Sequence, residues 1–224
     1  MTSMDFEKAR FNMVEQQIRP WEVLDQDVLN LLFTVKREDF APTAYRAIAF
    51  TDMEIPLGHD QAMMPPKIEA RLLQEVASKS GETVLEIGTG SGYLTALLAK
   101  CAKHVTSIEY FEDLSKSAAT RLHAANIINV TLKIGDAAQS PDTLLDAQAR
   151  FDVIVLTGSV PTVPQAYLQR LNVGGRFFAV VGDAPVMKAT LITKTAENQF
   201  ASVEIFETVV PPLINAAQPS RFNF

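Results

Sequence analysis

From residue 83 onward the sequence alternates short apolar runs with segments of helical periodicity. The runs that predict buried strands are residues 83–87, 105–108, 130–134, 151–156 and 176–181. The expected helices are residues 94–100, 114–124 and 164–171, the last of them ended by Gly174-Gly175. Apolar strands that alternate with helices are typical of a parallel sheet covered on both faces. The pattern therefore predicts an α/β fold.

The two ends of the chain have different patterns. Residues 190–195 and 203–209 predict an antiparallel hairpin, and residues 6–32 predict two short helices interrupted at Pro20. A loop-rich connection with short extended pieces is expected over residues 45–57, followed by a helix over 68–77. The expected fold is thus Rossmann-like: a doubly wound, mostly parallel seven-stranded sheet with an antiparallel C-terminal hairpin and an N-terminal helical segment. At 224 residues we expect one domain, with a lid segment at 1–80 and a cofactor-binding core at 81–224.

A glycine-rich loop follows the first expected strand, with the sequence Gly88-Thr89-Gly90-Ser91-Gly92-Tyr93. Doubly wound sheets bind ligands at the carboxyl ends of their strands, so this loop is the first candidate for a binding site. The dinucleotide fingerprint has the spacing G-x-G-x-x-G, but here the third glycine comes one position early and Tyr93 takes its place. The spacing argues against NAD, and the triphosphate-binding G-x-x-x-x-G-K-[ST] is not found.

Three carboxylates accompany the loop in the sequence. Glu109 ends the second expected strand, where it can accept hydrogen bonds from both hydroxyls of a ribose. Asp136 follows the third strand and is a candidate for an adenine amino group, while Glu86 precedes the loop and could face an amino group or a sulfonium. An acidic rim suits a cationic cofactor better than a pyrophosphate.

Composition excludes several other kinds of site. The formal charge is −6 and no run of Lys or Arg is present, so we expect no nucleic-acid partner. Cys101 is the only cysteine and the three histidines lack zinc-type spacing, so we expect no metal. No signal-peptide pattern or apolar stretch of about 18 residues is found, which predicts a cytoplasmic protein without a membrane span.

Taken together, the loop, Glu109 and Asp136 resemble class I methyltransferases, and the chain is similar to the protein-L-isoaspartate O-methyltransferase family over nearly its whole length. The more specific similarities are the segments 13–18, 37–42, 55–61, 84–93, 151–158, 171–176 and 210–213. The resemblance implies S-adenosylmethionine as cofactor, S-adenosylhomocysteine as product, and isoaspartyl residues of proteins or peptides as acceptors in the first step of protein repair. We expect a monomer or weak dimer. The cofactor-binding residues it implies are Glu86, Gly88, Thr89, Gly90, Ser91, Gly92, Tyr93, Glu109, Tyr110, Asp136, Ala137 and Thr157.

The acceptor segment departs from the family. Where the family usually reads Gln-Thr-Ile-Ser-x-Pro, this chain reads Gln61-Ala62-Met63-Met64-Pro65-Pro66, so Met64 stands where the active-site serine belongs. Since a carboxylate acceptor is already ionised at neutral pH, transfer needs alignment rather than a general base. The candidates for acceptor contact are Met64, His59 and Gln61, and Arg221 could pair with an acceptor carboxylate. Two alternatives stay open: a different protein or small-molecule acceptor, and a cofactor-binding protein without activity.

Overall fold

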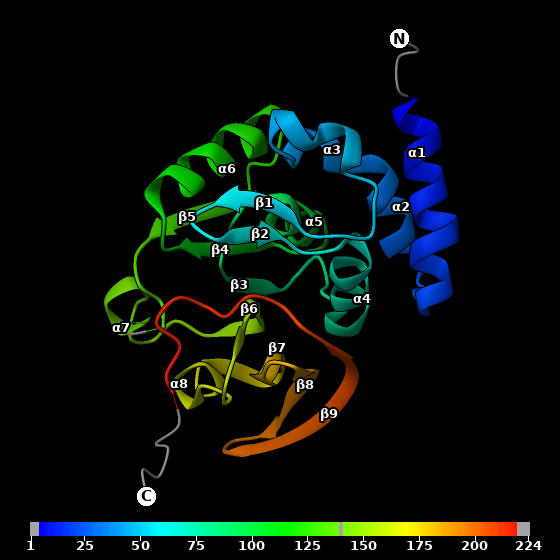
Figure 1. Cartoon of the computed structure of the whole chain (residues 1–224). Helices are drawn as coiled ribbons and strands as arrows, with labels where there is room; N and C mark the ends of the chain where they lie inside the picture. Colours follow the sequence, from blue (N-terminus) through cyan, green and yellow to red (C-terminus); the bar gives the residue numbers. More distant parts are fainter. Residues whose placement is uncertain (1–4, 139–140, 219–224) are drawn as a thin grey trace, which may run out of the picture.

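A computed structural model describes residues 5–138 and 141–218 and shows a seven-stranded sheet with helices on both faces (Figure 1). The strand order is β5-β4-β3-β6-β7-β8-β9. Strands β3 to β7 pair in parallel, whereas β8 and β9 are antiparallel additions at one edge. The strand bounds are β3 Thr83–Ile87, β4 His104–Glu109, β5 Val130–Ile134, β6 Phe151–Val160, β7 Leu171–Asp183, β8 Val186–Ala196 and β9 Gln199–Thr208.

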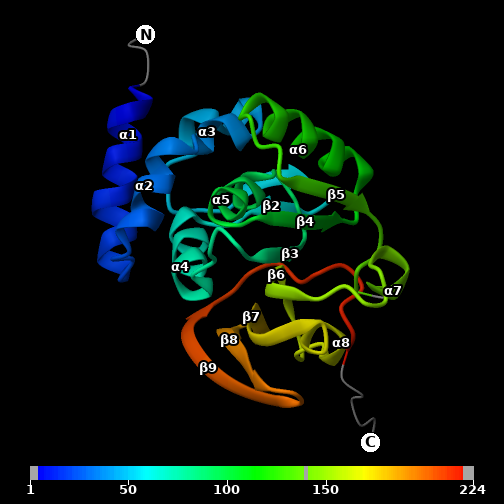
Figure 2. The ribbon, with the colours of Figure 1, turned by 180° about the vertical axis from the view of Figure 1, so that it is seen from behind.

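Two hydrophobic clusters cover the two faces of this sheet. Alternate residues of β3 belong to different clusters: Val84 packs with α4 (Pro66–Val76) and α5 (Tyr93–Cys101), whereas Leu85 packs with residues of α8 (Gln165–Leu168). This alternation is the period of two expected of a strand, and it requires both faces to be apolar. Seen from both sides, α7 (Pro141–Leu144) and α8 lie across the sheet from α4, α5 and α6 (Glu112–Ala124) (Figures 1 and 2).

The N-terminal segment packs beside α4 and α5. It contains α1 (Phe6–Met13), a π-helical turn at Val14–Ile18, a 3-10 turn at Arg19–Trp21 and α2 (Gln26–Thr34). The carboxylates of Asp5 and Asp25 accept hydrogen bonds from main-chain N–H groups at the starts of α1 and α2, which is why these helices begin there. Helix α3 (Arg37–Phe40) and a 3-10 turn at Thr43–Ile48 then lead to a two-stranded antiparallel sheet, β1 (Ile55–Gly58) and β2 (Gln61–Met63).

The structure confirms the expected fold class, the C-terminal hairpin, and strands 83–87 and 130–134 to the residue. The helix expected over 164–171 was wrong beyond Leu168, because Leu171 begins β7 and pairs with Phe151 of β6. Between this pair and the next pair, Val153 with Arg176, β7 has four intervening residues and β6 only one. Gly174-Gly175 therefore lies in a bulge of a strand and does not end a helix. The connection over 45–57 is in part a 3-10 turn, and α3 and α7 were missed.

Candidate active site

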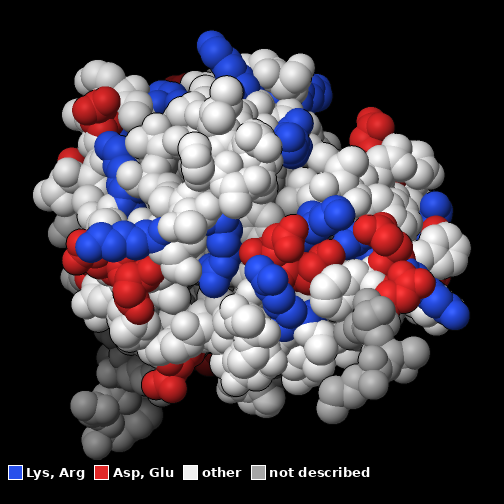
Figure 3. All heavy atoms as spheres, turned by 90° about the horizontal axis from the view of Figure 1, so that it is seen from above, with Lys and Arg blue, Asp and Glu red and all other residues white. Residues whose placement is uncertain are grey.

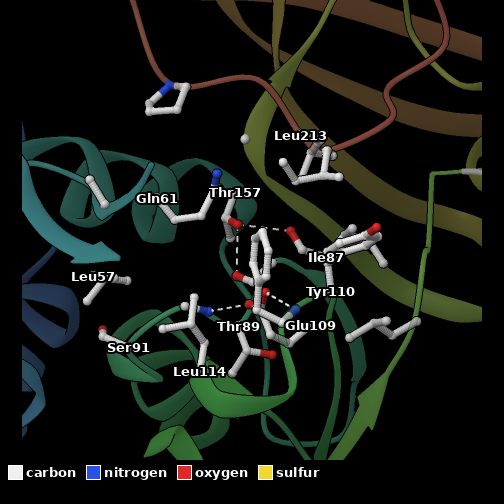
Figure 4. A pocket seen from close by; sticks show the side chains of 18 of the residues that line it. Leu57, Gln61, Ile87, Thr89, Ser91, Glu109, Tyr110, Leu114, Thr157 and Leu213 are labelled. Carbon is white, nitrogen blue, oxygen red and sulfur yellow. Dashed lines mark hydrogen bonds between the residues drawn. The ribbon is translucent and has the colours of Figure 1, made fainter. Parts of the chain in front are cut away.

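A cavity opens at the carboxyl ends of β3, β4, β5 and β6, with an empty volume of about 950 Å³ including its mouth (Figure 4). Chain segments following β3, β4 and β5 supply one half of the wall, and residues between Glu54 and Glu69 supply the other half. We call these the nucleoside half and the acceptor half. The strand order reverses here, since β4 and β5 lie on one side of β3 and β6 lies on the other. Open α/β sheets bind their ligands at such a point.

The glycine loop sits tightly against β6 at the base of the cavity. The Thr157 hydroxyl lies 2.9 Å from the Ile87 carbonyl oxygen and 2.8 Å from that of Gly88, so it can donate its proton to either. Gly88 has φ +98, and a Cβ atom built on it would lie 2.1 Å from the Thr157 hydroxyl oxygen. The pairing of β6 with β7 is irregular between Val155 and Ser159, which places Thr157 at a bulge facing the loop.

Glu109 fixes the other side of the loop. Its carboxylate accepts hydrogen bonds from the main-chain N–H of Gly90 at 2.8 Å and from that of Phe111 at 3.0 Å (Figure 4). Each carboxylate oxygen retains lone pairs, so the group can still accept hydrogen bonds from two ligand hydroxyls. The side chain is 5% exposed and lines the cavity, which agrees with a role at a ribose.

The C-terminal segment closes the nucleoside half from the opposite side. Main-chain hydrogen bonds of 2.9 Å join Ser159 to Pro211 and to Leu213, and Leu213 projects into the cavity (Figure 4). The Asn215 amide donates to Asp136 at 2.6 Å, and Tyr167 donates to the carbonyl of Ala137 at 2.6 Å. These bonds hold the segment after β5 in place.

The acceptor half is formed mainly by the end of the β1-β2 sheet and by α4. Gln61, Ala62, Met63 and Met64 all line it, and Met64 is 8% exposed. The main chain of Met64 is held from behind by Arg37, whose guanidinium donates to the Met64 carbonyl at 2.6 Å. The side chains at positions 62 to 64 carry no hydroxyl, so this stretch of the wall is apolar.

Of the sequence-predicted residues, the structure brings most to the cavity wall and leaves four out of it. Those in the wall are Gln61, Met64, Gly88, Thr89, Gly90, Ser91, Glu109, Tyr110, Asp136, Ala137 and Thr157. Gly92 and Tyr93 are the start of α5 behind the loop, and the His59 ring stacks on Phe111 at 4.1 Å and bonds to Asp113. Wall residues not proposed from sequence include Glu54, Leu57, Glu69, Leu114, Pro211 and Leu213. Arg221 lies outside the described residues.

Glu86 is the fourth residue outside the wall, and it is completely buried beneath the loop. One carboxylate oxygen accepts from the Thr95 hydroxyl at 2.5 Å and from the Ser107 hydroxyl at 2.6 Å, and Ser107 in turn bonds to Thr89 at 2.6 Å. Glu86 therefore supports the loop through Ser107 instead of meeting a ligand. Burial away from any cation raises the pKa of its carboxyl to about 8.

The raised pKa of Glu86 predicts how stability depends on pH. A glutamate in the unfolded chain has a pKa of about 4.3, so between that value and about 8 the folded protein retains a proton that the unfolded chain loses. This contribution to stability is complete below pH ~4.3 and is lost as pH rises toward 8, by up to about 1.4 kcal/mol per pH unit. Glu86→Gln cannot lose a proton, so it should gain stability relative to the parent as pH rises.

Urea unfolding of the parent and Glu86→Gln at intervals from pH 5 to pH 9 measures this difference. Gln keeps an oxygen that can accept from Thr95 and Ser107, so the two proteins differ mainly in titration. A difference in unfolding free energy that stays constant across the range would mean that Glu86 is already ionised in the folded protein.

All charged side chains in the described wall are acidic: Glu54, Glu69, Glu109 and Asp136. A wall of this kind favours a cationic ligand and opposes phosphate.

On one outer face, Lys and Arg are interspersed with Asp and Glu (Figure 3). No described helix is long and apolar enough to cross a membrane, and no described group of three or more His, Cys, Asp or Glu could hold a metal.

A mostly parallel sheet with a glycine loop after β3, an acidic residue at the end of β4 and an antiparallel hairpin at one edge defines a Rossmann-like methyltransferase fold. The family model of protein-L-isoaspartate(D-aspartate) O-methyltransferase matches residues 8–217, and the chain belongs to this family. A protein-L-isoaspartate O-methyltransferase of Petrotoga mobilis is 35% identical over 191 residues, which cover 85% of this chain and 88% of the relative. One from Pelobacter propionicus is 34% identical over 211 residues, covering 94% and 98% of the two chains.

The fold agrees with a solved structure of the same kind. A Plasmodium falciparum structure named for this methyltransferase and described in complex with S-adenosylhomocysteine superposes with a TM-score of 0.80 at 19% identity. The superposition covers 94% of this chain and 98% of the other. At this identity the likeness shows the fold, and it extends over the N-terminal segment as well as the sheet.

Proposed function

We propose that the protein transfers the methyl group of S-adenosylmethionine to the carboxylate of L-isoaspartyl residues in damaged proteins. The observation that carries this proposal is that two segments line one cavity: the glycine loop, which resembles the family, and residues 61–64, which stand where the family has its acceptor segment. Because both segments line the same cavity, a nucleoside cofactor bound at the loop and an acceptor side chain at residues 61–64 would meet there.

The residues present fit the cofactor. Gly88 has no Cβ, so the loop can pack against Thr157 with its backbone uncovered. Glu109 has lone pairs that can accept hydrogen bonds from a ribose. Asp136, just after β5, lines the cavity and can accept a hydrogen bond from an adenine amino group. The acidic wall favours a sulfonium and an α-amino group. The expected cofactor-binding set retains Gly88 to Ser91, Glu109, Tyr110, Asp136, Ala137 and Thr157, while Glu86, Gly92 and Tyr93 act from behind the loop.

The proposed reaction is an in-line displacement. When bound, the cofactor supplies an electrophilic methyl group; a carboxylate oxygen of the acceptor forms the new bond to it as the carbon–sulfur bond breaks. The products are a methyl ester and neutral S-adenosylhomocysteine, and no proton needs to be removed. The chain therefore contributes by aligning the two reactants and excluding water, for which the buried Met63 and Met64 are suited.

The test is methyl incorporation from labelled cofactor into an isoaspartyl peptide, with the ordinary aspartyl peptide of the same sequence as control. We expect base-labile label, released as methanol, in the isoaspartyl peptide alone. Tight binding of S-adenosylhomocysteine without turnover of the isoaspartyl peptide above background would contradict the proposal.

A second acceptor class is favoured by one observation, the missing hydroxyls at Ala62 and Met64 in the acceptor half. Under the proposed function, Met64→Ser adds a hydrogen-bond donor for the acceptor carboxylate and should raise kcat/KM for the isoaspartyl peptide about tenfold relative to Met64→Ala. Met64→Ala serves as the control because it removes the same methionine volume without adding the hydroxyl. Equal activity of the two variants would favour another carboxylate or a small-molecule acceptor.

A further inference from the structure

Glu54 is a cavity-lining carboxylate that the proposed function does not use. It precedes β1, and the register Ile55 to Met63 and Pro56 to Ala62 places Glu54 opposite Met64 at the open end of the β1-β2 ladder. Both Glu54 and Met64 line the acceptor half. Glu54 therefore stands beside the position at which the acceptor carboxylate must enter.

The side chain of Glu54 makes no hydrogen bond or ion pair within residues 5–138 and 141–218. Two polar side chains from the same part of the chain are engaged elsewhere: Lys67 pairs with Asp52 at 2.6 Å, and the Gln61 amide donates to the His59 carbonyl at 3.2 Å. Partial burial raises the pKa of Glu54, as expected of a carboxylate that has lost water without gaining a partner.

The other carboxylates of the wall each have a hydrogen-bond or ion-pair partner within the chain. Glu69 is paired with Arg37, Glu109 accepts two main-chain N–H groups, and Asp136 accepts from Asn215. No Lys or Arg is found in the described wall. An acceptor that brings a carboxylate next to Glu54 adds a second negative charge, and a cation between the two would offset the repulsion.

We infer that Glu54 selects acceptors that carry a basic side chain, lysine or arginine, next to the methyl-accepting isoaspartyl residue. The inference rests on the proposed function for the identity of the accepting carboxylate. Glu54 acts as a specificity residue: its carboxylate pairs with the ammonium or guanidinium of the neighbouring acceptor residue. The apolar stem of that residue lies along Met63 and Met64.

The experiment compares isoaspartyl peptides that differ only in having Lys, Gln or Glu beside the isoaspartyl residue, on its N-terminal side in one set and its C-terminal side in the other. At pH 8 and low salt, the protein should methylate the Lys peptide of one set with kcat/KM about three- to tenfold above the Gln peptide and should discriminate further against Glu. Glu54→Gln should bring the Lys-to-Gln ratio near one. The ratio in the parent protein should also decline with added salt.

Asp60→Asn is the matched control. Asp60 lies in the turn between β1 and β2, at the other end of the ladder from Glu54; it is exposed and does not line the cavity, and its φ of +55 suits asparagine. It removes the same charge and should leave the peptide ratio unchanged. A ratio that survives in Glu54→Gln, or that falls equally in Asp60→Asn, overturns the assignment of Glu54.

Peptide binding to the protein saturated with S-adenosylhomocysteine separates this inference from the proposed function. Tighter binding of the Lys peptide that depends on Glu54, without methylation of any peptide, would refute the proposed reaction and support the charge selection. Methylation of all the isoaspartyl peptides at equal rates would support the proposed reaction and refute the charge selection by Glu54. Absence of both binding and methylation would refute both.

Discussion

Replacing Arg37 with methionine is expected to lower the free energy of unfolding by about 3–5 kcal/mol, the usual cost of leaving a buried charge without its partner. Arg37 and Glu69 are 0% and 3% exposed, and the two form a buried ion pair. The same guanidinium donates to the carbonyls of Ala49 at 2.9 Å and Met64 at 2.6 Å. Methionine can replace none of these donors, so a carboxylate and two carbonyl oxygens would lose their hydrogen bonds.

Loss of Arg37 should lower the methylation of the acceptor peptide more than it weakens the binding of the cofactor. Arg37 joins α3, the end of β2 and α4, and its guanidinium lies 4.9 Å from the centre of the Tyr93 ring. It therefore positions Met64 directly, whereas its contact with the nucleoside half is indirect, through Tyr93 behind the glycine loop. At a temperature where Arg37→Met is still folded, we expect kcat/KM for the acceptor peptide to fall at least about tenfold, while the Kd for S-adenosylhomocysteine changes less than about threefold.

A double variant separates the ion pair from the positioning role. Arg37→Met with Glu69→Leu removes both charges and fills the site with apolar atoms, a change that is often neutral for stability. Stability should therefore return, as measured by urea unfolding, while the peptide kcat/KM stays low because the Met64 carbonyl still lacks its donor. If the double variant regains full activity, Arg37 has no positioning role beyond neutralising Glu69.

The fold was accessible from the sequence because the parallel strands are buried on both faces. Such strands appear as nearly continuous apolar runs, and β3, in which all residues but the first are buried, was located to the residue. The edge strand β5 was also located to the residue, from an alternation of apolar and polar residues. The errors occur where local sequence and tertiary pairing disagree. Leu168 and Leu171 continue a helical spacing, but Leu171 is buried by pairing with Phe151 in β6, a contact across 20 residues that no local pattern contains.

The candidate site was predictable only where one strand and its following loop define it. The glycine loop follows β3 and Glu109 ends β4, the neighbouring parallel strand, so topology alone brings them together. Glu54, Pro211 and Leu213 reach the cavity from distant parts of the chain, and Arg37 looks like a surface residue of a short polar helix although it is fully buried. Glu86 could have been placed better, because strand alternation puts it on the same face as Val84, toward α5.

Replacing Gly88 with alanine is expected to weaken binding of S-adenosylhomocysteine by at least about 100-fold, equivalent to about 2.7 kcal/mol. The new methyl group would lie 2.1 Å from the Thr157 hydroxyl oxygen, far inside contact distance. That hydroxyl cannot turn away freely, since it is bonded to the carbonyls of Ile87 and Gly88. The loop must therefore move away from β6, into the space that the cofactor is proposed to occupy.

Two causes contribute to this effect, and they can be measured separately. The φ of +98 at Gly88 is unfavourable for alanine whatever surrounds it, at a cost of about 1–3 kcal/mol. Gly174 has φ +84 with nothing within 4 Å of a Cβ, and it does not line the cavity. Gly174→Ala therefore reports the backbone cost alone, and should reduce stability in urea without changing the Kd for S-adenosylhomocysteine.

The steric part is tested by adding Thr157→Ala to Gly88→Ala. Removing the Thr157 hydroxyl leaves its Cβ 3.5 Å from the new methyl group, an ordinary contact, so the loop can return toward its position while the backbone cost persists. Calorimetry should show that the double variant regains about tenfold or more of the lost affinity, although Thr157→Ala alone removes a hydrogen bond to the loop and weakens binding. If the losses of binding free energy in Gly88→Ala and Thr157→Ala simply add in the double variant, Thr157 does not set the position of the glycine loop.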